Sequence, residues 1–353
     1  MNRREFLKYT FSICASIPLG NTVTYGSYLK GNAKSNLAGM TVIDAHAHPD
    51  HFQSTSSNDE TSTLEKIKQL KMNASCFAGV GDSTSSAVSF EDLVNQLLYV
   101  KGLEGQGEVK IVRKYSNLPR TVRPPSNPPG AILAVEGATP LGEDLNKVDE
   151  LYEYGVRIIT LMHYQVNAFG DIMTAGPVNG GLTDIGKQMV ERMMDLGIIV
   201  DVAHAHYNTL QGIAEIARTN GVPIIDSHTS LTGRENPYGT TRLRTLEEME
   251  MVAETGGVVC TWPLAWWVDE THHRTTFSDW ATENGKIAKQ IGSNHIGLGT
   301  DGGGSLPELI EGYSSILDLT KLVDAMHGVG FSQSGVKAYM GGNLSKVIKK
   351  CIG

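Results

Sequence analysis

The chain has 353 residues, 40% of them hydrophobic, so it is long enough to bury a large core. Acidic residues outnumber Lys and Arg by 38 to 30, and the formal net charge is −8. This balance argues against a nucleic-acid backbone as the main partner, because proteins bind such backbones through an excess of positive charge.

The first twenty residues have the features of a bacterial export signal. Arg3 and Arg4 precede Phe6-Leu7-Lys8, and an uncharged stretch follows up to Gly20. A basic start with a short apolar segment is typical of such signals, and this one resembles the twin-arginine (Tat) type. We expect a Tat-like signal and linker over residues 1–35, transport by the Tat export machinery, and a location in the periplasm or outside the cell. The alternative is a cytosolic amphipathic start. The apolar stretch is too short for a stable transmembrane span.

Residues 36–353 are assigned to a single domain in which short apolar runs alternate with helical patterns. Such alternation indicates a parallel sheet covered by helices. The runs predicted as strands are Thr41–His48, Ala74–Gly79, Ala131–Gly137, Val156–His163, Ile198–His204, Val222–His228, Gly257–Trp262 and His295–Asp301. Eight strand–helix units predict an α/β fold, a TIM-type (β/α)8 barrel.

Three helix starts carry a signal of their own. Ser62-x-x-Glu65 and Thr245-x-x-Glu248 have the spacing of a capping box. Thr183-Asp184 opens a further helix, whose apolar residues recur at helical spacing.

The first predicted strand ends in Asp44-Ala45-His46-Ala47-His48. Residues two apart on a strand point the same way, so His46 and His48 are expected to project together. Two converging imidazoles suit a divalent metal of the zinc type. Asp44 is a candidate to accept a hydrogen bond from one ligand ring. By itself the pattern is also compatible with a pair of ordinary surface or core histidines.

Other predicted strands also end in polar residues while their bodies stay apolar. These residues are Glu136, His163, His204, His228 and Asp301. In a TIM-type barrel the chemically active side chains lie where the strands end. The sequence therefore predicts that these residues meet His46 and His48 at one rim of the barrel.

This set of residues has the composition of a site for two metal ions. His46, His48, His204, His228, Glu136 and Asp301 are the candidate metal ligands, and Glu136 is the candidate bridge because a carboxylate offers two oxygens. Two adjacent cations would acidify a water between them to hydroxide at neutral pH. Asp301 is placed to take the proton from that water and pass it to a leaving amine. The predicted reaction is metal-assisted hydrolysis.

From about Thr41 to Val347 the chain resembles the membrane dipeptidase (renal dipeptidase, peptidase M19) family of the amidohydrolase superfamily. The stretches that carry the resemblance are Asp44–His48, Ala134–Gly137, Gly155–His163, Gly181–Thr183, Gly186-Lys187, Leu196–His204, Pro223–His228, Gly256–Val259, His295–Asp301 and Gly341–Asn343. The resemblance implies the barrel of the metal-dependent amidohydrolases and a dinuclear zinc dipeptidase, in a family that tends to form homodimers.

The resemblance also implies roles for individual residues. One zinc would be held by His46, His48 and Glu136, and the other by Glu136, His204 and His228. Asp301 would be the proton shuttle beside the metals, and His163 would contact the scissile carbonyl. Arg242 falls where the family has an arginine that binds the substrate carboxylate, although Arg234 and Arg244 lie close in sequence. His206 is an alternative to His204 as a ligand.

Two departures from the family pattern bear on the substrate. The family usually has His-x-Asp at the first site, whereas this chain has His46-x-His48. Gly302-Gly303-Gly304 follow Asp301, where the family usually has a bulky residue and an acid. The first change makes the site one charge more positive, and the second changes the loop beside the substrate.

Rival functions remain open at this point. One is an amidohydrolase acting on another small amide, such as an N-acyl amino acid. Another is a TatD-like metal-dependent nuclease, whose ligand pattern is similar but which suits the acidic charge and the export signal poorly. A phosphotriesterase-type lactonase would use a carboxylated lysine in place of Glu136. A metal-binding barrel without enzymatic activity is the last alternative.

Overall fold

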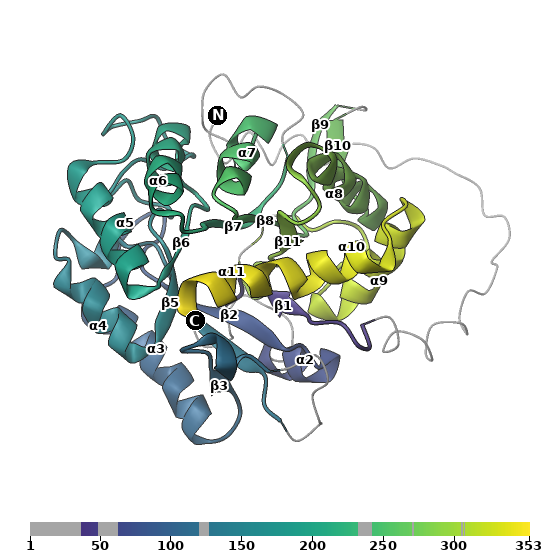
Figure 1. Ribbon diagram of the computed structural model, residues 1–353, viewed down its shortest axis with the longest axis horizontal. Coiled ribbons are helices and arrows are strands. Elements are labelled where there is room, and N and C mark those ends of the chain that lie inside the picture. The colour runs from purple at the N-terminus through teal and green to yellow at the C-terminus, as the bar shows by residue number, and fades with distance from the viewer. Residues whose placement is uncertain are drawn as a thin grey trace, which may run out of the picture. The chain divides into compact units, whose positions relative to one another are not determined.

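Eight parallel strands form a ring at the centre of the fold (Figure 1). Neighbours in this ring pair in the order β1, β2, β4, β5, β6, β7, β8 and β11. Their bounds are Ile43–Asp44, Ala74–Val80, Gly130–Glu136, Val156–Thr160, Ile199–Asp201, Ile225–Thr229, Val258–Thr261 and Ile296–Leu298, in the same order. Every predicted strand is present, and the prediction of a (β/α)8 barrel is confirmed. Several strands end earlier than predicted because the chain leaves the sheet before the polar residues.

The computed structural model describes residues 37–48, 63–119, 127–231, 242–269, 272–304, 306 and 308–353, all within the unit Asn36–Gly353. The predicted export signal and linker lie outside these ranges, as does Ser62 of one predicted capping box. Among the helices that the structure describes, none combines the length and the apolar character needed to cross a bilayer.

The ring closes between its first and last strands through backbone hydrogen bonds. The amide of Ala45 donates to the carbonyl of Leu298 over 2.9 Å, and the amide of Asp301 donates to the carbonyl of His46 over 2.9 Å. The amide of His48 donates to Gly302 over 2.8 Å. These bonds join the segment of His46 and His48, near the start of the domain, to the segment of Asp301, near its end. Closure of the barrel therefore also assembles the site.

Helices cover the outside of the ring, as expected for strands linked in parallel. The α-helices are α2 (Thr63–Leu70), α3 (Phe90–Gly105), α4 (Asn146–Tyr154), α5 (Asp184–Leu196), α6 (Tyr207–Asn220), α7 (Leu246–Glu254), α8 (Phe277–Ile291), α9 (Leu319–Gly328), α10 (Gln333–Lys337) and α11 (Asn343–Ile352). Shorter turns are η2 (Tyr115–Asn117), η3 (Thr139–Leu141), η4 (Ile316–Asp318) and η5 (Ala338–Gly342). The predicted capping box at Thr245 and Glu248 is present, and Thr183 caps α5.

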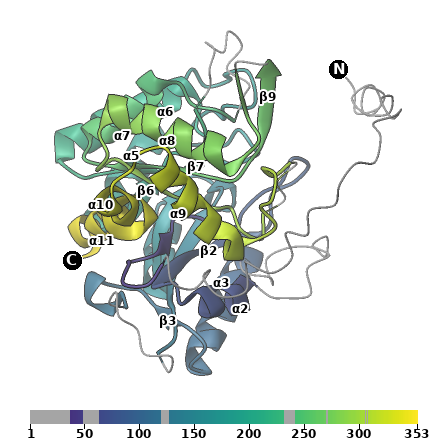
Figure 2. The same cartoon turned by 90° about the vertical axis from the view of Figure 1, so that its right-hand side faces the viewer.

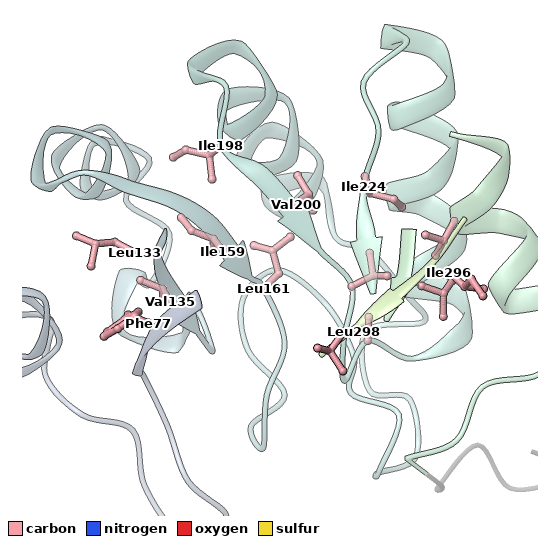
Figure 3. Packing of buried hydrophobic residues seen from close by; sticks show 14 of the residues in the cluster. Phe77, Leu133, Val135, Ile159, Leu161, Ile198, Val200, Ile224, Ile296 and Leu298 are labelled. Carbon is pink, nitrogen blue, oxygen red and sulfur yellow. The ribbon is translucent and has the colours of Figure 1, made fainter. Parts of the chain in front are cut away.

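Alternate residues of each strand enter different cores. Leu133, Val135, Ile159 and Val200 point outward and pack under the helices (Figure 3). Their neighbours along the same strands, such as Ile132, Ile158 and Ile199, belong to a separate cluster inside the ring. This is the period of two that a pleated strand imposes, and it explains why the strand sequences are apolar on both faces.

Helix α11 covers the end of the ring where the strands begin. In Figure 1 it runs across the strands, and its residues Leu344, Val347 and Ile348 join the inner cluster. Two short strands that were not predicted form a hairpin after β8, namely β9 (Trp266–Asp269) and β10 (His272–Arg274). A third unpredicted strand, β3 (Lys110–Ile111), pairs with β4. Figure 2 shows α11 and β9 on opposite sides of the strands, so the rim opposite α11 is left for the site.

Gly299 permits the close approach of β11 to the segment that carries a candidate ligand. A Cβ atom at this position would lie 1.7 Å from the carbonyl oxygen of Ser227, the residue before His228. No side chain fits at that distance, so the backbone would have to move. Gly102 is the opposite case, because it is exposed on α3 and no heavy atom lies within 4 Å of its Cβ position.

We predict that Gly299→Ala lowers the free energy of unfolding by at least about 1–3 kcal/mol, the usual effect of overpacking a core. The matched control Gly102→Ala should raise it by about 0.5–1 kcal/mol, because alanine has the better helix propensity. Chemical denaturation of both variants measures the two changes. Equal stabilities would contradict the close packing of β11 on Ser227.

Candidate metal centre and active site

The residues predicted at the strand ends meet at one rim of the barrel. His46 and His48 follow β1, Glu136 ends β4, and His228 lies in β7. The remaining three stand three residues beyond a strand, and these are His163 after β5, His204 after β6 and Asp301 after β11. Apart from Asp301, each of these side chains is buried.

The carboxylate of Glu136 lies at the centre of five imidazoles. Its Oε1 lies 3.3 Å from Nε2 of His46, 3.1 Å from that of His204 and 3.6 Å from that of His228. Its Oε2 lies 3.3 Å from Nε2 of His48 and 3.4 Å from that of His163. Asp301 joins the group through Oδ1, which lies 3.2 Å from Nε2 of His48. One buried carboxylate thus links two groups of histidines.

Hydrogen bonds at Nδ1 orient the rings of His46, His48 and His228, whereas Nδ1 of His204 is buried and has no hydrogen-bond partner among the described residues. Nδ1 of His48 lies 3.3 Å from the carbonyl oxygen of Ala78. Nδ1 of His46 and Nδ1 of His228 lie 3.3 Å and 2.9 Å from the same hydroxyl, Oγ of Ser227. A carbonyl can only accept and a hydroxyl has two lone pairs, so these partners favour a proton on each Nδ1. The Nε2 atoms then face Glu136 and the space beside it, where a bound cation would replace the protons that His46 and His48 hold at their raised pKa values.

The spacing of the Nε2 atoms fits metal coordination. Nε2 of His46 lies 3.2 Å from that of His48, and Nε2 of His204 lies 3.1 Å from that of His228. Tetrahedral ligands at zinc distances stand about 3.4 Å apart. The guanidinium of Arg242 donates to Nε2 of His204 over 3.0 Å, so a positive group is accommodated at this nitrogen. The residues present therefore fit a divalent cation.

The electrostatics of the site match that chemistry. Burial, with the nearby Arg242 charge, holds the pKa of His204 well below its usual value, and burial with the charge of His46 does the same for the pKa of His228. Burial opposes ionisation of Glu136, but the charges of the surrounding histidines outweigh it and hold that pKa well below its usual value. Neutral imidazoles and an ionised carboxylate are the forms that bind a metal.

His46 and His48 differ from His204 and His228 in their proton affinity. Burial disfavours the charged form of His46, but the charge of Glu136 outweighs burial and raises its pKa. His48 shows the larger effect. Burial disfavours its charged form, yet hydrogen bonds to Asp301 and Glu136 outweigh burial and raise its pKa to about 10. A cation bound here would replace this proton, so binding at the first pair of histidines is coupled to proton release.

Two of the site residues have an unusual backbone. His204 has φ of 66° and Asp301 has φ of 50°, both in the left-handed region that residues with a Cβ rarely adopt. Such conformations persist only where the surrounding structure imposes them, and they concentrate at functional sites. Here they turn the chain out of the strand so that the side chain faces the rim.

A cavity of about 550 Å³ opens above these residues. The candidate metal ligands other than His46 lie on its floor, together with His163. Its walls include Arg242, Tyr164 and Trp262 and the apolar side chains of Val80, Val88, Leu264 and Leu306. The volume is in the range of small-molecule sites, roughly 300–1,000 Å³.

The model of the membrane dipeptidase family, peptidase family M19, matches residues 33–351. The chain belongs to this family. Dipeptidase tcpJ of Claviceps purpurea is 24% identical over 221 residues, which are 62% of this chain and 50% of that protein. The chain spans about half the length of the curated relatives it matches.

Solved structures of similar proteins have the same fold. The probable dipeptidase PvdM from Pseudomonas aeruginosa superposes with a TM-score of 0.75 at 17% identity, covering 90% of this chain and 97% of that one. A metallo peptidase from Rhodobacter sphaeroides, solved with a phosphinate mimic of the dipeptide L-Ala-D-Ala, gives 0.71 at 16% identity, covering 88% and 99%. At these sequence identities the structural similarity supports the barrel fold of this M19 protein alone.

The expectation that Asp44 orients a ligand ring is wrong. Its two oxygens accept hydrogen bonds from the amide and hydroxyl of Thr300 and from the amide of His46. Asp44 therefore ties β1 to the segment that follows β11, because its oxygens accept from Thr300 and from a backbone amide and not from an imidazole. The hydroxyl of Ser227 contacts the ligand rings in its place.

The structure shows which of the neighbouring histidines and arginines lie at the site. His206 caps α6 and accepts from the amide of Asn208, whereas His204 faces Glu136. Arg244 is buried in ion pairs with Asp226 and Glu248. Arg242 lines the cavity and lies over the Trp262 ring, with 5.1 Å to the ring centroid. Arg234 lies outside the described residues.

Two of the three glycines after Asp301, Gly303 and Gly304, pack closely on candidate ligands. A Cβ at Gly303 would lie 2.1 Å from the carbonyl oxygen of His48, and one at Gly304 would lie 2.1 Å from Oδ1 of Asp301. The departure from the family pattern in this loop therefore allows the backbone to approach His48 closely. Gly304 itself lies in the cavity wall.

Asp82, Tyr164 and Trp262 are cavity residues that sequence reasoning did not single out. Two of them follow strands at which no site residue was predicted. Asp82 lies two residues beyond β2, and Trp262 follows β8 directly. Extending the strand-end rule to these strands would have found both.

We predict that Ser227→Ala weakens zinc binding about 10- to 100-fold, the usual effect of removing a partner that orients a metal-binding histidine. The matched control is Ser75→Ala, since Ser75 is also buried in a barrel strand but donates to the carbonyl of Cys76. Competition with a chelator measures the affinity. Equal affinities in the wild type and Ser227→Ala would show that the hydroxyl does not orient the ligands.

Proposed function

We propose that this protein is a dinuclear zinc-dependent hydrolase that cleaves dipeptides. Membership of the membrane dipeptidase family and the buried cluster of His, Glu and Asp side chains support the proposal. The observation that carries it is the position of Glu136, whose two oxygens each lie within 3.3 Å of imidazole nitrogens. Nitrogen-rich sets of this kind favour zinc among the common divalent ions.

We divide the ligands between two ions as the family resemblance implied, and the separation of the Nε2 atoms within each pair is compatible with this division. His46 and His48 form one close pair and His204 and His228 form the other, with Glu136 in contact with both pairs. Bound there, two divalent ions would acidify a water molecule and polarise the scissile carbonyl. Proton transfer and substrate binding are then assigned to side chains that face the cavity.

Asp301 is the proposed proton carrier. Its side chain lies beside His48 at the cavity floor and is more exposed than that of Glu136, at 12% against 3%. A carboxylate in this place can accept a proton from the attacking water and deliver it to the leaving amine. Its left-handed backbone holds it at the rim, where both partners can reach it.

His163 and Arg242 are the proposed substrate contacts. Nε2 of His163 reaches the cavity floor at Oε2 of Glu136, which places the ring beside a carbonyl that is bound there. The guanidinium of Arg242 is the cation in the described cavity wall, and it suits a substrate carboxylate because it can donate two parallel hydrogen bonds.

A dipeptide is the substrate we favour, and its size is compatible with the cavity volume. The Rhodobacter sphaeroides protein with the same barrel was solved with a mimic of a dipeptide. Another small amide with a free carboxylate, such as an N-acyl amino acid, meets the same requirements and is the second candidate. We also propose that the protein is exported through the Tat machinery, on the basis of Arg3, Arg4 and the apolar stretch that follows.

We predict that metal-loaded protein hydrolyses L,L- or L,D-dipeptides and that Asp301→Asn lowers kcat roughly 10²- to 10⁴-fold, the usual contribution of a positioned acid–base group. Metal content should stay at the wild-type value. Asp195→Asn, the same change at an exposed position on α5, is the control and should leave kcat unchanged. Full activity of Asp301→Asn would remove Asp301 from the mechanism. Hydrolysis of N-acyl amino acids alone would select the second candidate.

We predict that Arg242→Ala raises KM roughly 10- to 100-fold for substrates with a free carboxylate, since a hydrogen bond to a charged group is lost. Esterified substrates should be affected much less. Arg218→Ala, which removes a surface ion pair with Glu254, should change neither KM. An equal rise in KM for free and esterified substrates would show that Arg242 does not bind the carboxylate.

A further inference from the structure

Asp82 is a buried carboxylate in the cavity wall that takes no part in the candidate metal cluster. It is 1% exposed and follows β2. Its Oδ1 accepts a hydrogen bond from the backbone amide of Tyr164 over 2.9 Å and lies 3.0 Å from Nδ1 of His163. Its Oδ2 accepts from the hydroxyl of Thr139 over 2.5 Å. One carboxylate therefore joins the segments that follow β2, β4 and β5.

The contacts of Asp82 fix the direction of the His163 ring. Nδ1 of that ring also lies 3.0 Å from the backbone oxygen of Asp82. Both neighbours of Nδ1 are acceptors, so this nitrogen carries a proton and donates. The ring cannot turn without losing these bonds, and its Nε2 consequently stays aimed at the cavity floor beside Glu136.

Two glycines make room for this arrangement. A Cβ at Gly137 would lie 2.9 Å from Oδ2 of Asp82 and 3.0 Å from Cβ of His163. A Cβ at Gly81 would lie 1.9 Å from the carbonyl oxygen of Gly137. The backbone at Glu136-Gly137 and the segment of Asp82 thus pack too closely for any larger residue, which brings the carboxylate within reach of His163.

Tyr164 is the second side chain that depends on Asp82. Its ring lies against His163, with 4.1 Å between centroids, and edge-on to His204 at 5.7 Å. It is 40% exposed and lines the cavity. Within the described part of the chain its hydroxyl has no hydrogen-bond partner, so the group is available to a bound molecule.

We propose that Asp82 is a positioning residue that holds His163 and Tyr164 together as one wall of the substrate-binding cavity. In this wall His163 contacts the scissile carbonyl, and the Tyr164 hydroxyl donates a hydrogen bond to a neighbouring acceptor atom of the substrate. The inference rests on the proposed function, because it assigns substrate contacts in that cavity. Asp82 fixes His163 through a hydrogen bond to its ring and fixes Tyr164 through a hydrogen bond to its backbone amide. A buried anchor of this kind keeps reacting groups within the small tolerances that catalysis needs.

The test compares Asp82→Ala with Asp82→Asn in full-length, metal-loaded protein. Asp82→Ala removes every side-chain contact and should lower kcat/KM for a dipeptide at least about tenfold, with zinc affinity unchanged. In Asp82→Asn the amide oxygen can still accept from Tyr164 and His163 while its nitrogen faces Thr139, so most of the activity should return. Thr139→Val, a milder change at the same anchor, should give an intermediate loss if Asp82→Ala does not fold.

A double-mutant cycle separates positioning from general stability. Once His163 and Tyr164 have both been replaced by alanine, a further Asp82→Ala change should cost almost nothing in kcat/KM, because its targets are gone. Asp279→Ala, which removes the capping-box carboxylate at the start of α8, away from the cavity, is the control. It should lower the melting temperature without changing kcat or KM.

Tyr164→Phe should raise KM with zinc content unchanged.

The outcomes are distinct. Full additivity in the cycle, or a failure of Asp82→Asn to regain activity that Asp82→Ala loses, would overturn the positioning role while the wild type still hydrolyses dipeptides. A wild type that binds two zinc ions and neither cleaves dipeptides nor binds a phosphinate dipeptide mimic would overturn the proposed function and this inference with it.

Discussion

The structure depends on the burial of one carboxylate among five imidazoles. Removing an ionised carboxylate from water costs several kcal/mol unless its charge is matched. Glu136 meets this condition because His46 and His48, whose pKa values are raised, each lie 3.3 Å from one of its oxygens, and His204 contacts it as well. The order of the strands decides which side chains stand around it. The site and the barrel are therefore one arrangement, and a change in strand register would leave the charge without partners.

Close backbone contacts hold that arrangement in place. The positions that matter are those where strands approach too closely for a side chain, such as Gly299 against Ser227 and Gly81 against Gly137. They bring Ser227 between two ligand rings and Asp82 beside His163. Packing of the backbone thus controls the orientation of side chains that do not contact the glycines themselves.

The departures from the family pattern gather around His48. This histidine carries the hydrogen bonds to Asp301 and Glu136 that give it a high proton affinity, and Gly303 packs on its backbone. The small loop and the added imidazole therefore occupy the same part of the site. A member of the membrane dipeptidase family with this pair of changes has a distinct charge and shape at one edge of its cavity, and this is where its substrate preference is expected to differ.

The sequence alone was sufficient for the barrel and for the residues at its rim. Alternation of apolar runs with helical patterns predicts parallel strands, and a parallel barrel gathers all strand ends on one face. For that reason His46, Glu136, His204, His228 and Asp301 could be placed together although up to 255 residues separate them in the sequence. No knowledge of individual contacts was needed, because the rule depends only on strand direction.

The partners of each side chain were decided by the tertiary structure. Asp44 was expected to hold a ligand ring, but it bonds to Thr300, and Ser227 contacts the rings instead. The pairing of Asp82 with His163 joins residues 81 apart and has no sequence pattern. Such contacts depend on register, on strand spacing and on where a glycine permits close approach. These are properties of neighbouring chain segments in space, which a single linear sequence does not display.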